Sequence, residues 1–594
     1  MSTIGAPADG LRSIHRSIPP YLSMLVLLGV AACAPSEESV QLEEGAEAVG
    51  AKSADKTPVV NVDRSLIITD LPTLEAKDSR GNFIFSLERV LNQLAATSGP
   101  NPGGLDAAKL YQRIFDTNNT KAGGFVPDGQ HCDDQKDAIG RAVLNGVPID
   151  CPRQEGALAD LSKHNPFCSG PGCDPYTPLA LVNRFDLAPS NGQNCGQYRM
   201  IFAKGFQRSP LETAGNQLIG NRNLLIFESV LPNPKPHQGL KGCSKLVQFW
   251  AGLTEMNDAA KRAEELDRFF FKGVGGFAAA LRWEHFSGDW DPQTGEFLSG
   301  QIRANQFLND QAGGGLGQPW QLREYHLRRS CSGNGPKQNC KPDVRMDPTL
   351  VNPDARLFDD TNLSALALSF RDPNNPKGFI SQIPELARAD LNRLNMNKLG
   401  REYNSGQSTS QPSLVAGGPP VVNDTNYSLF FNANGAFAQR IQTKLNAIKS
   451  TLTPTQIVRR AQSQACGGCH QLSSSTASIF GGNAQANQIG GGFVWPDLAP
   501  GPEIAPGVRP LAFVQVSDAV LVPLATGVNC NTACTAEPAT CQCAWAVSPA
   551  LLNGFLPYRR DNMLEYLKGL VPGNSPPGRD RDDDGDSGGH DPGF

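Results

Sequence analysis

Residues 453–470 read TPTQIVRRAQSQACGGCH and place a capped helix directly before two cysteines and a histidine. Thr453 is predicted to be the N-cap and Pro454 the first helical residue, and Gln456 completes a capping box. Apolar residues then follow at helical spacing. The sequence therefore predicts a helix over 454–465 that delivers its C-terminal end to the motif C-x-x-C-H.

The spacing of Cys466, Cys469 and His470 is that of a covalent haem-attachment site. Each thiol can add to one vinyl group of the porphyrin, and the adjacent histidine can supply the proximal nitrogen to the iron. Gly467 and Gly468 add no side-chain bulk where backbone and macrocycle must approach each other. Two cysteines at this spacing also occur in disulfides, zinc half-sites and redox pairs, and these alternatives remain open.

On these three residues and the helix before them, the region 427–577 resembles the c-type cytochromes. The resemblance is local and covers at most the last quarter to third of the chain. It implies a mainly α-helical domain with covalent haem c, and a role in electron transfer. It leaves the function of the preceding region unassigned, because a shared site says little about the rest of a chain.

The sixth ligand of the iron separates the functional alternatives, since an electron-transfer haem usually carries an axial methionine or a second histidine. After the motif the chain offers only Met563 and His590. Met563 lies in a predicted apolar helix, which suits a thioether ligand and ordinary core packing equally. Met396 is the next candidate. An iron without such a ligand would favour peroxide or small-ligand chemistry.

The N-terminus predicts export and a lipid anchor. Basic residues precede the apolar stretch 21–30, YLSMLVLLGV, which is too short to cross a membrane. Residues 30–33, VAAC, resemble the bacterial lipobox, in which the cysteine, here Cys33, carries lipid. Because Ala34 follows, the resemblance implies an outer-membrane lipoprotein facing the periplasm or the cell surface. Simple signal-peptidase cleavage is the alternative.

The chain has 15 cysteines, and an even number remains once Cys33 is assigned to lipid and Cys466 and Cys469 to haem. An even remainder in an exported protein predicts up to six disulfides. Near neighbours suggest these pairs: Cys132 with Cys151, Cys168 with Cys173, Cys195 with Cys243, and Cys331 with Cys340. The cluster of Cys530, Cys534, Cys541 and Cys543 is expected to pair within itself.

At 594 residues the chain is too long for one ordinary domain. Composition predicts a signal peptide (1–32), a flexible acidic tether (33–62), an α+β domain of unknown function (63–405), a linker (406–426), the cytochrome c-like haem domain (427–577) and an acidic disordered tail (578–594). The net charge of −5, without a basic face, gives no sign of nucleic-acid binding. Membrane contact is expected through the lipid anchor.

The region 63–405 is predicted to be α+β with an antiparallel sheet, because its strand candidates neighbour one another while its helices stand apart. The predicted strands are 65–68, 179–185, 198–203, 223–231, 301–307 and 320–327, with a further one at 510–522. The predicted helices are 87–95, 105–115, 245–253, 258–271 and 380–399, followed by 436–449, 454–465, 549–555 and 559–570.

Other motifs are weaker. The middle region has no hydrolase, zinc-protease or phosphate-loop signature. His285 and His326 stand beside acidic or aromatic residues and read as hydrogen-bonded histidines that could hold a metal or substrate if they met in space. Arg184 and Asp186 suggest a salt bridge. Residues 580–591 match the start of a calcium loop, with a solvated acidic tail as the alternative.

Three functions follow from these observations. The first is a lipid-anchored c-type haem protein in electron transfer, with an unidentified redox partner. The second is an enzyme, a haem-dependent oxidoreductase or peroxidase whose middle domain binds a small-molecule substrate. The third is a non-catalytic, disulfide-rich surface lipoprotein in which the C-x-x-C is structural.

Overall fold

The computed structural model describes 58–101, 103–168, 173, 175–204, 223–291, 296–307, 320–332, 339–388, 391–409, 425–469, 516–528, 530, 541–548 and 551–569. Residues Thr57–Phe594 form one compact unit. The predicted signal peptide, Cys33 and most of the tether lie outside the described residues, as does the whole of the acidic tail with its calcium-loop pattern.

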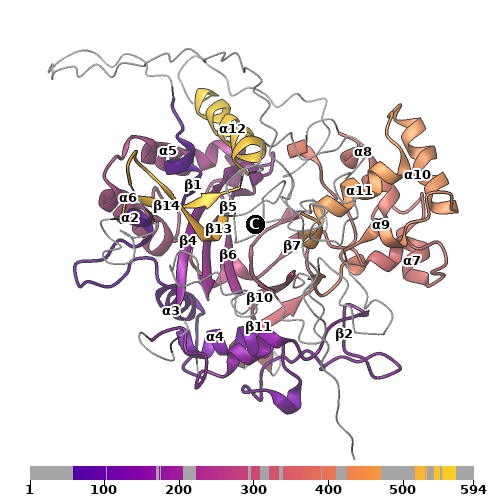
Figure 1. The fold of residues 1–594 in the computed structure, drawn as a ribbon, viewed down its shortest axis with the longest axis horizontal. Helices are drawn as coiled ribbons and strands as arrows, with labels where there is room; N and C mark the ends of the chain where they lie inside the picture. Colours follow the sequence, from indigo (N-terminus) through magenta and orange to yellow (C-terminus); the bar gives the residue numbers. More distant parts are fainter. Residues whose placement is uncertain are drawn as a thin grey trace, which may run out of the picture. The chain divides into compact units, whose positions relative to one another are not determined.

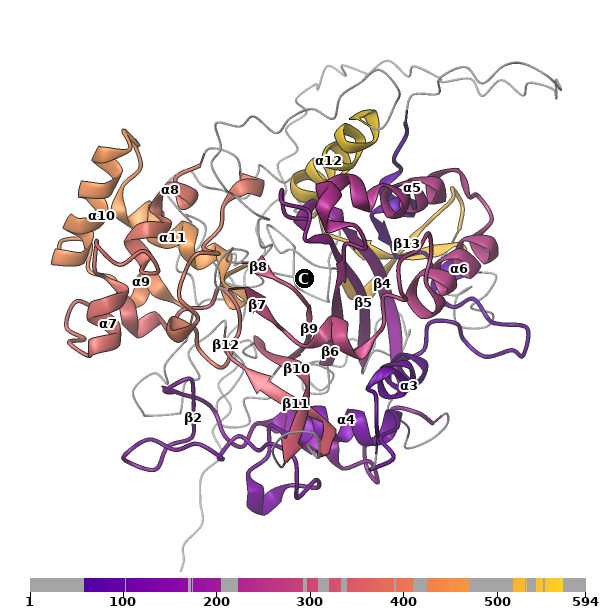
Figure 2. The same ribbon diagram turned by 180° about the vertical axis from the view of Figure 1, so that it is seen from behind.

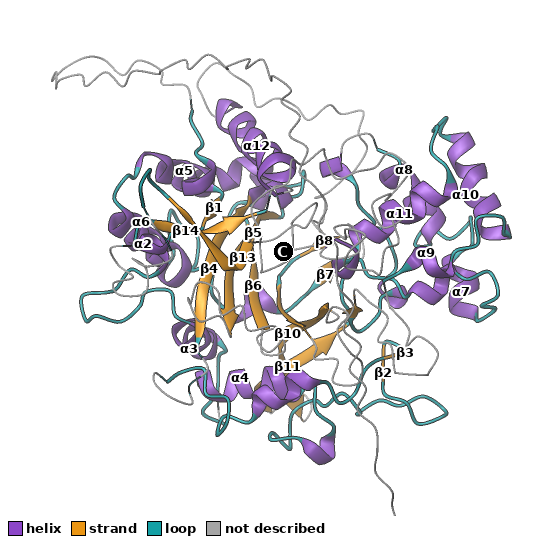
Figure 3. Ribbon diagram, in the orientation of Figure 1, coloured by secondary structure: helices purple, strands orange, loops and turns teal. Residues whose placement is uncertain are grey.

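An eight-stranded antiparallel sheet organises this unit (Figures 1 and 3). The strand order is β1-β4-β5-β6-β9-β10-β11, and β12 also pairs with β10. The strands are β1 (Ile67–Ile68), β4 (Tyr176–Arg184), β5 (Asn194–Lys204), β6 (Asn223–Pro232), β9 (Gln301–Phe307), β10 (Trp320–Ser332), β11 (Asn339–Asp347) and β12 (Ser408–Thr409). The predicted α+β class with an antiparallel sheet is therefore confirmed.

Helices cover one face of this sheet. They are α1 (Val62–Ser65), α2 (Leu71–Leu74), α3 (Leu87–Thr97), α4 (Ala107–Asp116), α5 (Ser244–Gly252) and α6 (Ala259–Asp267). Ser86 and Asp106 cap α3 and α4, since each side chain accepts a backbone N–H of the first turn. On the covered face Tyr198 of β5 stacks on Trp250 of α5, with ring centroids 5.6 Å apart. We call this side of the sheet the apolar face.

A second hydrophobic cluster joins residues from both sides of the predicted linker. It contains the helices α7 (Ala365–Phe370), α8 (Ile383–Leu386), α9 (Tyr427–Phe430), α10 (Ala436–Ala447) and α11 (Pro454–Gln464), grouped together in Figure 2. At its centre Phe358 stacks on Tyr427 with ring centroids 4.3 Å apart. Residues before 406 and after 426 thus share one core, and within the predicted linker β12 joins the central sheet.

The C-terminal elements pack against the first part of the compact unit. Strands β13 (Val516–Pro523) and β14 (Cys543–Val547) pair with each other, and α12 (Leu556–Gly569) follows. The backbone N–H of Trp545 donates to Thr69 O at 3.0 Å, and the hydroxyl of Tyr566 donates to Leu240 O at 2.7 Å. The region predicted to be a separate haem domain is therefore built into the same unit as the sheet.

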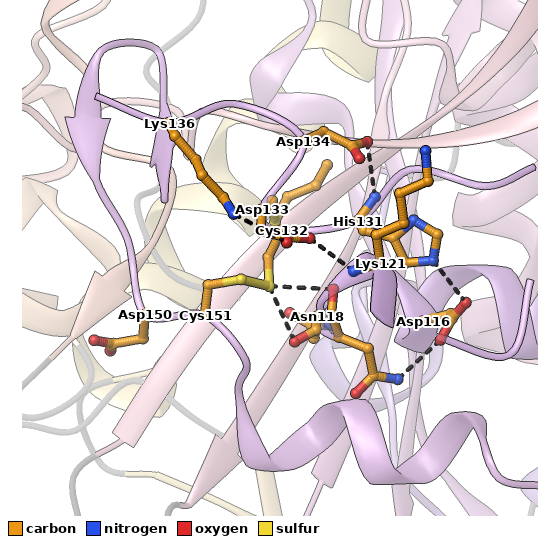
Figure 4. The surroundings of a disulfide bond; sticks show 12 residues. Asp116, Asn118, Lys121, His131, Cys132, Asp133, Asp134, Lys136, Asp150 and Cys151 are labelled. Carbon is orange, nitrogen blue, oxygen red and sulfur yellow. Dashed lines mark hydrogen bonds and ion pairs between the residues drawn. A yellow bond between two sulfur atoms is a disulfide. The ribbon is translucent and has the colours of Figure 1, made fainter. Parts of the chain in front are cut away.

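The disulfides follow the predicted neighbour pairing. Cys132–Cys151, Cys168–Cys173, Cys195–Cys243 and Cys331–Cys340 are confirmed, as is Cys530–Cys543 within the last cluster. Cys541 is also disulfide-bonded, and Cys534 lies outside the described residues. Figure 4 shows the first pair beside Asp116, which accepts the backbone N–H of Phe125 and of Val126 and so closes the loop after α4.

Most predicted elements are confirmed within a few residues of their ends, but the helix at 380–399 is wrong. The described residues there form a 3-10 turn, Phe379–Gln382, the short α8, and a second 3-10 turn, Leu391–Arg393. Further on, Asn395 Nδ2 donates to Arg393 O and Asn395 Oδ1 accepts the N–H of Asn397. Asparagine side chains satisfy the backbone locally in this way and so compete with helix formation.

Two other differences concern strands. The predicted strand 65–68 begins later, because Asn61 caps the helical turn α1 and leaves only β1 extended. Strand β11 was not predicted. It contains Pro342, and proline is tolerated at a sheet edge, where this strand lies. The short hairpins β2 (Val143–Leu144) with β3 (Val147–Pro148) and β7 (Trp290–Asp291) with β8 (Glu296–Phe297) were not predicted either.

Candidate haem-attachment site

Helix α11 has the N-terminus that the sequence predicts. Thr453 Oγ1 accepts the N–H of Gln456 at 3.3 Å, and Gln456 Oε1 accepts the N–H of Thr453 at 2.7 Å, which completes the capping box. The helix ends at Gln464, one residue earlier than predicted, because Ala465 is extended at φ −76° and ψ 147°. The apolar side of α11 is buried in the second hydrophobic cluster, which fixes the position of its end.

After Ala465 the chain makes one helical turn over residues 466–469, in which the N–H of Cys469 donates to Ala465 O at 2.8 Å. Side chains three residues apart in such a turn lie on the same side. The surroundings of Cys466 and Cys469 differ, since Cys466 contacts Leu322 whereas Cys469 belongs to the main hydrophobic cluster. His470 lies outside the described residues.

The structure shows why residue 468 is a glycine, for a reason that the sequence did not indicate. A Cβ at this position would lie 1.7 Å from Gln462 O, so any side chain would collide with the last turn of α11. The glycine lets the cysteine turn fold back against the helix. Gly467 is held from the other side, because its N–H donates to Ser408 Oγ of β12 at 2.7 Å.

The two motif cysteines differ from the remaining cysteines in their bonding. Both are buried and neither forms a disulfide, whereas every other cysteine among the described residues is disulfide-bonded. Burial raises the pKa of Cys466 to about 12, despite the nearby Arg303 guanidinium, which lowers it. Redox-active and reactive thiols have lowered pKa values, so the surroundings of Cys466 favour an uncharged sulfur.

The cysteine turn rests on the face of the sheet opposite the apolar face. Cys466 packs against Leu322 of β10, which pairs in register with Ser408 of β12. Residues paired directly across an antiparallel sheet share a face. Leu322 and Ser408 thus form a common platform under the cysteine turn.

Beside this platform lies a set of buried polar and charged residues, which we call the charged face. The strand registers place them on one side of the sheet: Arg199, Glu228, Gln301, Arg303, Glu324, His326 and Asp347. All of them are buried except Asp347, which is about one quarter exposed (24%). Because an isolated buried charge is costly, each of these groups requires a partner.

Glu228 lies at the centre of the charged face. Its carboxylate accepts from Gln301 Nε2 at 2.6 Å and pairs with the guanidinium groups of Arg199 and Arg303, each at 3.5 Å. Arg303 Nε donates in turn to Glu324 Oε2 at 3.1 Å. Burial acts against the charge of Arg303, yet the neighbouring acidic groups raise its pKa, so this guanidinium stays charged. Burial raises the pKa of Glu324.

Met563, the predicted axial ligand, has a different location. It is buried on α12, and its thioether accepts a hydrogen bond from Asn183 Nδ2 of β4 at 3.7 Å. Asn183 pairs with Tyr198 and so lies on the apolar face, whereas Cys466 contacts the other face at β10. Four strand spacings separate β4 from β10, or about 19 Å. Met563 and Cys469 nevertheless belong to the same extended hydrophobic cluster, so Met563 as an axial ligand stays a prediction.

The other candidates noted in the sequence are placed as follows. Met396 is buried in the second hydrophobic cluster, which also contains Ala465. His285 Nδ1 bonds to Ala280 O at 2.9 Å, while His326 Nδ1 bonds to Asp347 Oδ2 at 2.5 Å, so the two histidines have separate partners. The predicted salt bridge between Arg184 and Asp186 is confirmed at 2.9 Å.

In the part of the chain that the structure describes, no group of three or more His, Cys, Asp or Glu side chains is arranged to hold a metal ion. Within the same residues, no helix combines the length and the apolar character that a membrane crossing needs.

The charged face was missed by the sequence reasoning. Its signal was present, because Gln301, Arg303 and Asn305 alternate with apolar residues along a predicted strand. In antiparallel sheets such alternation usually marks a side that faces solvent. Only the packing shows that both sides of β9 are buried.

Comparison with known proteins finds no matching family model, no similar curated protein and no similar solved structure. The site is therefore interpreted from its own residues and from the resemblance of its motif.

Proposed function

We propose that this chain is an exported, lipid-anchored c-type haem protein that transfers electrons. Cys466 and Cys469 would hold the haem through thioether bonds, His470 would be the proximal ligand, and Cys33 would carry the lipid at the outer membrane. The observation that supports this most is the pair of adjacent buried cysteines without a disulfide. All other cysteines among the described residues are in disulfides, so the bonding of Cys466 and Cys469 sets them apart and supports a separate role for the motif.

The residues around the turn suit such a group. A covalently bound haem supplies one-electron chemistry. The platform of Leu322 and Ser408 fixes the attachment turn against the sheet, and the burial of both cysteines keeps water from it. Glu228 and Arg303 are held by fixed hydrogen bonds and ion pairs, so the neighbouring charges need little rearrangement when an electron arrives.

A second candidate is a haem-dependent oxidoreductase or peroxidase. The observation in its favour is the nearness of acid–base groups, since Glu324 and His326 follow Leu322 at alternate positions on the same face of β10. Such groups could move protons for a small-molecule substrate. This reading requires a haem with an open coordination position.

The decisive experiment is to produce the mature protein by export together with haem-attachment machinery and to extract it under denaturing conditions. Haem that stays on the polypeptide is expected for the wild type and is lost in the double variant Cys466→Ala/Cys469→Ala. The matched control is Cys331→Ala/Cys340→Ala, which removes a disulfide pair elsewhere and should retain haem. A wild type without covalent haem would contradict the proposal and leave a disulfide-rich lipoprotein of unassigned function.

A separate experiment addresses the location. Cys33→Ala should release the protein from the membrane fraction of the producing cell into the soluble fraction of the envelope, because a lipid chain is the predicted anchor. A variant that stays in the membrane fraction would contradict the anchor while leaving the haem proposal intact.

A further inference from the structure

A row of three ionisable side chains leads from the surface of the molecule to the charged face under the cysteine turn. The side chain of Asp347 on β11 is 24% exposed, whereas those of His326 and Glu324 on β10 are 0% exposed. Glu324 and His326 are alternate residues of one strand, and Asp347 pairs in register with Glu324. All three side chains therefore lie on one face of the sheet.

His326 lies between the two carboxyl groups of this row. Its Nδ1 bonds to Asp347 Oδ2 at 2.5 Å, and its Nε2 lies 3.4 Å from Glu324 Oε1. The second distance is slightly longer than a hydrogen bond, as is common for proton-transfer groups at rest. An imidazole can accept a proton at one ring nitrogen and release a proton from the other. His326 thus connects a carboxyl that water reaches with one that is fully buried.

Glu324 has a carboxylate oxygen that is able to bind a proton. Its Oε2 accepts from Arg303 Nε at 3.1 Å, but its Oε1 has no hydrogen-bond partner among the described residues. Glu228 differs, because Gln301 and two guanidinium groups contact its oxygens. Burial raises the pKa of Glu324 and the charge of Glu228 adds to this rise, while Arg303 and His326 act against it. Glu324 is therefore suited to hold a proton inside the protein.

The ring of His326 is held in place between these partners. A Cβ on Gly288 would lie 2.2 to 2.5 Å from three atoms of the ring, so the glycine lets the backbone pack directly against it. Burial acts to raise the pKa of Asp347, but its bond to His326 and the charges of Arg328 and Arg401 lower it to about 2. Asp347 therefore stays ionised at neutral pH and keeps Nδ1 on its side of the ring.

The buried end of the row lies beside the proposed haem attachment. Cys466 packs on Leu322, which precedes Glu324 by two residues on the same face of β10. Glu324, Glu228 and Arg303 are close enough for their charges to shift the pKa of Cys466. A negative charge added at such a buried place is costly, and it favours the protonated form of a nearby carboxyl.

We propose that Asp347, His326 and Glu324 form a proton relay, through which one proton reaches Glu324 for each electron that the site takes up. This inference rests on the proposed haem attachment, since a covalently bound haem would supply the site for the electron. Uptake of one electron together with one proton leaves the buried charge unchanged.

The transfer conserves every proton. The neutral ring of His326 begins with its proton on Nε2, and a proton from water passes across the Asp347 carboxylate to Nδ1. The imidazolium then releases its Nε2 proton to Glu324 Oε1, which forms an O–H bond. The ring is left neutral with its proton on Nδ1, and the steps run in reverse when the electron leaves.

The pH dependence of the haem potential tests the coupling of proton to electron. From about pH 5 to about pH 9, the midpoint potential of the wild-type haem protein should fall by up to about 59 mV for each tenfold drop in proton concentration. A constant potential would overturn the inference. Covalent retention of haem after denaturation is measured on the same sample, so failure of the relay is distinguished from failure of haem attachment.

Infrared spectroscopy identifies the group that takes up the proton. The reduced-minus-oxidised difference spectrum of the wild type should gain the C=O stretching band of a neutral carboxyl, and its absence would overturn the inference without any variant. Glu324→Gln should lack this band and most of the pH dependence. The matched control Glu155→Gln removes another fully buried carboxyl, paired with Arg153 at 2.7 Å, and should retain both. A Glu324→Gln protein that retained both would contradict the assignment.

The rate of proton uptake tests His326. After rapid photoreduction, a pH-indicator dye should report that His326→Gln takes up its proton about 100-fold more slowly than the wild type, the order of effect that a positioned acid–base group has. The matched control His285→Gln removes another buried histidine, which bonds to Ala280 O, and should keep the wild-type rate. An unchanged rate in His326→Gln would exclude this histidine from the relay.

Discussion

Tyr198 and Arg199 are neighbours on β5, both 1% exposed, and they show how differently the two faces of the sheet are stabilised. Tyr198 stacks on Trp250 and packs edge-on to Phe269, so its burial is driven by apolar contact. Arg199 is buried among polar groups, bonding Gln197 Oε1 at 2.6 Å and pairing with Glu228. Burial of Tyr198 is therefore favourable in itself, whereas burial of Arg199 costs free energy that its hydrogen bond and ion pair must offset.

Apolar contacts on the apolar face stabilise the fold. On the charged face, ion pairs fix the positions of buried charged side chains, and the desolvation of these side chains costs free energy. Buried ion pairs often contribute little net stability, because desolvation offsets their attraction. Their retention here coincides with the position of the cysteine turn, which rests on Leu322 beside Glu324. The following changes test this difference between the two faces.

The largest effect is expected from Glu228→Ala. This change leaves the buried guanidinium groups of Arg199 and Arg303 without their shared carboxylate, and breaking a buried pair costs about 3–5 kcal/mol. The free energy of unfolding from urea denaturation measures it. Glu264→Ala, an exposed change on α6, is the control and should be near neutral. If the free energy of unfolding fell by less than about 1 kcal/mol, the guanidinium groups of Arg199 and Arg303 would have to find other partners without the Glu228 carboxylate.

On the apolar face, Met200→Ala should cost about 3 kcal/mol, since Met200 is fully buried and its loss leaves a cavity. The cost should not change with pH, because no charge is involved. Urea denaturation at pH 5 and pH 8 checks this, and a pH-dependent difference would show that the two faces are coupled.

A smaller, pH-dependent effect is expected for Asp347→Asn at the border of the charged face. Burial alone would raise the pKa of Asp347, but its bond to His326 and the nearby positive charges lower it to about 2, from an ordinary 3.8. A carboxyl whose pKa is lowered on folding stabilises the protein above its unfolded pKa. That contribution is lost as the pH falls from about 4 to about 2.

The variant should therefore be about 2 kcal/mol less stable than the wild type at pH 7, and the difference should disappear near pH 2. Urea denaturation across this range measures it. An equal difference at both ends would show that the ionised carboxylate is not responsible.

The smallest effect is expected at the start of α11, which delivers the cysteines to the charged face. Thr453→Ala removes the capping hydroxyl and should cost about 1 kcal/mol. Thr453→Ser retains the hydroxyl and should have a stability near that of the wild type. The difference between the two variants therefore gives the contribution of the capping hydroxyl. Thermal unfolding of both variants measures the difference, and equal melting temperatures would exclude a contribution from the hydroxyl.

The sequence alone determined the features that depend on a few neighbouring residues. The capping box of α11 spans Thr453 to Gln456, and β9 and β10 were predicted as partners across one loop. Disulfides such as Cys132–Cys151 join nearby cysteines. These interactions are short-range, so their residues carry the signal within one stretch of sequence.

Only the tertiary structure decided where the motif lies. Gly467 meets Ser408 across 59 residues, and Met563 meets Asn183 across 380, separations that no local pattern encodes. The charged face is likewise buried although alternation alone predicts it to be exposed: Cys466 contacts Leu322, and Gly288 lies against the ring of His326. Burial depends on what packs above a strand, and that partner comes from a distant part of the chain.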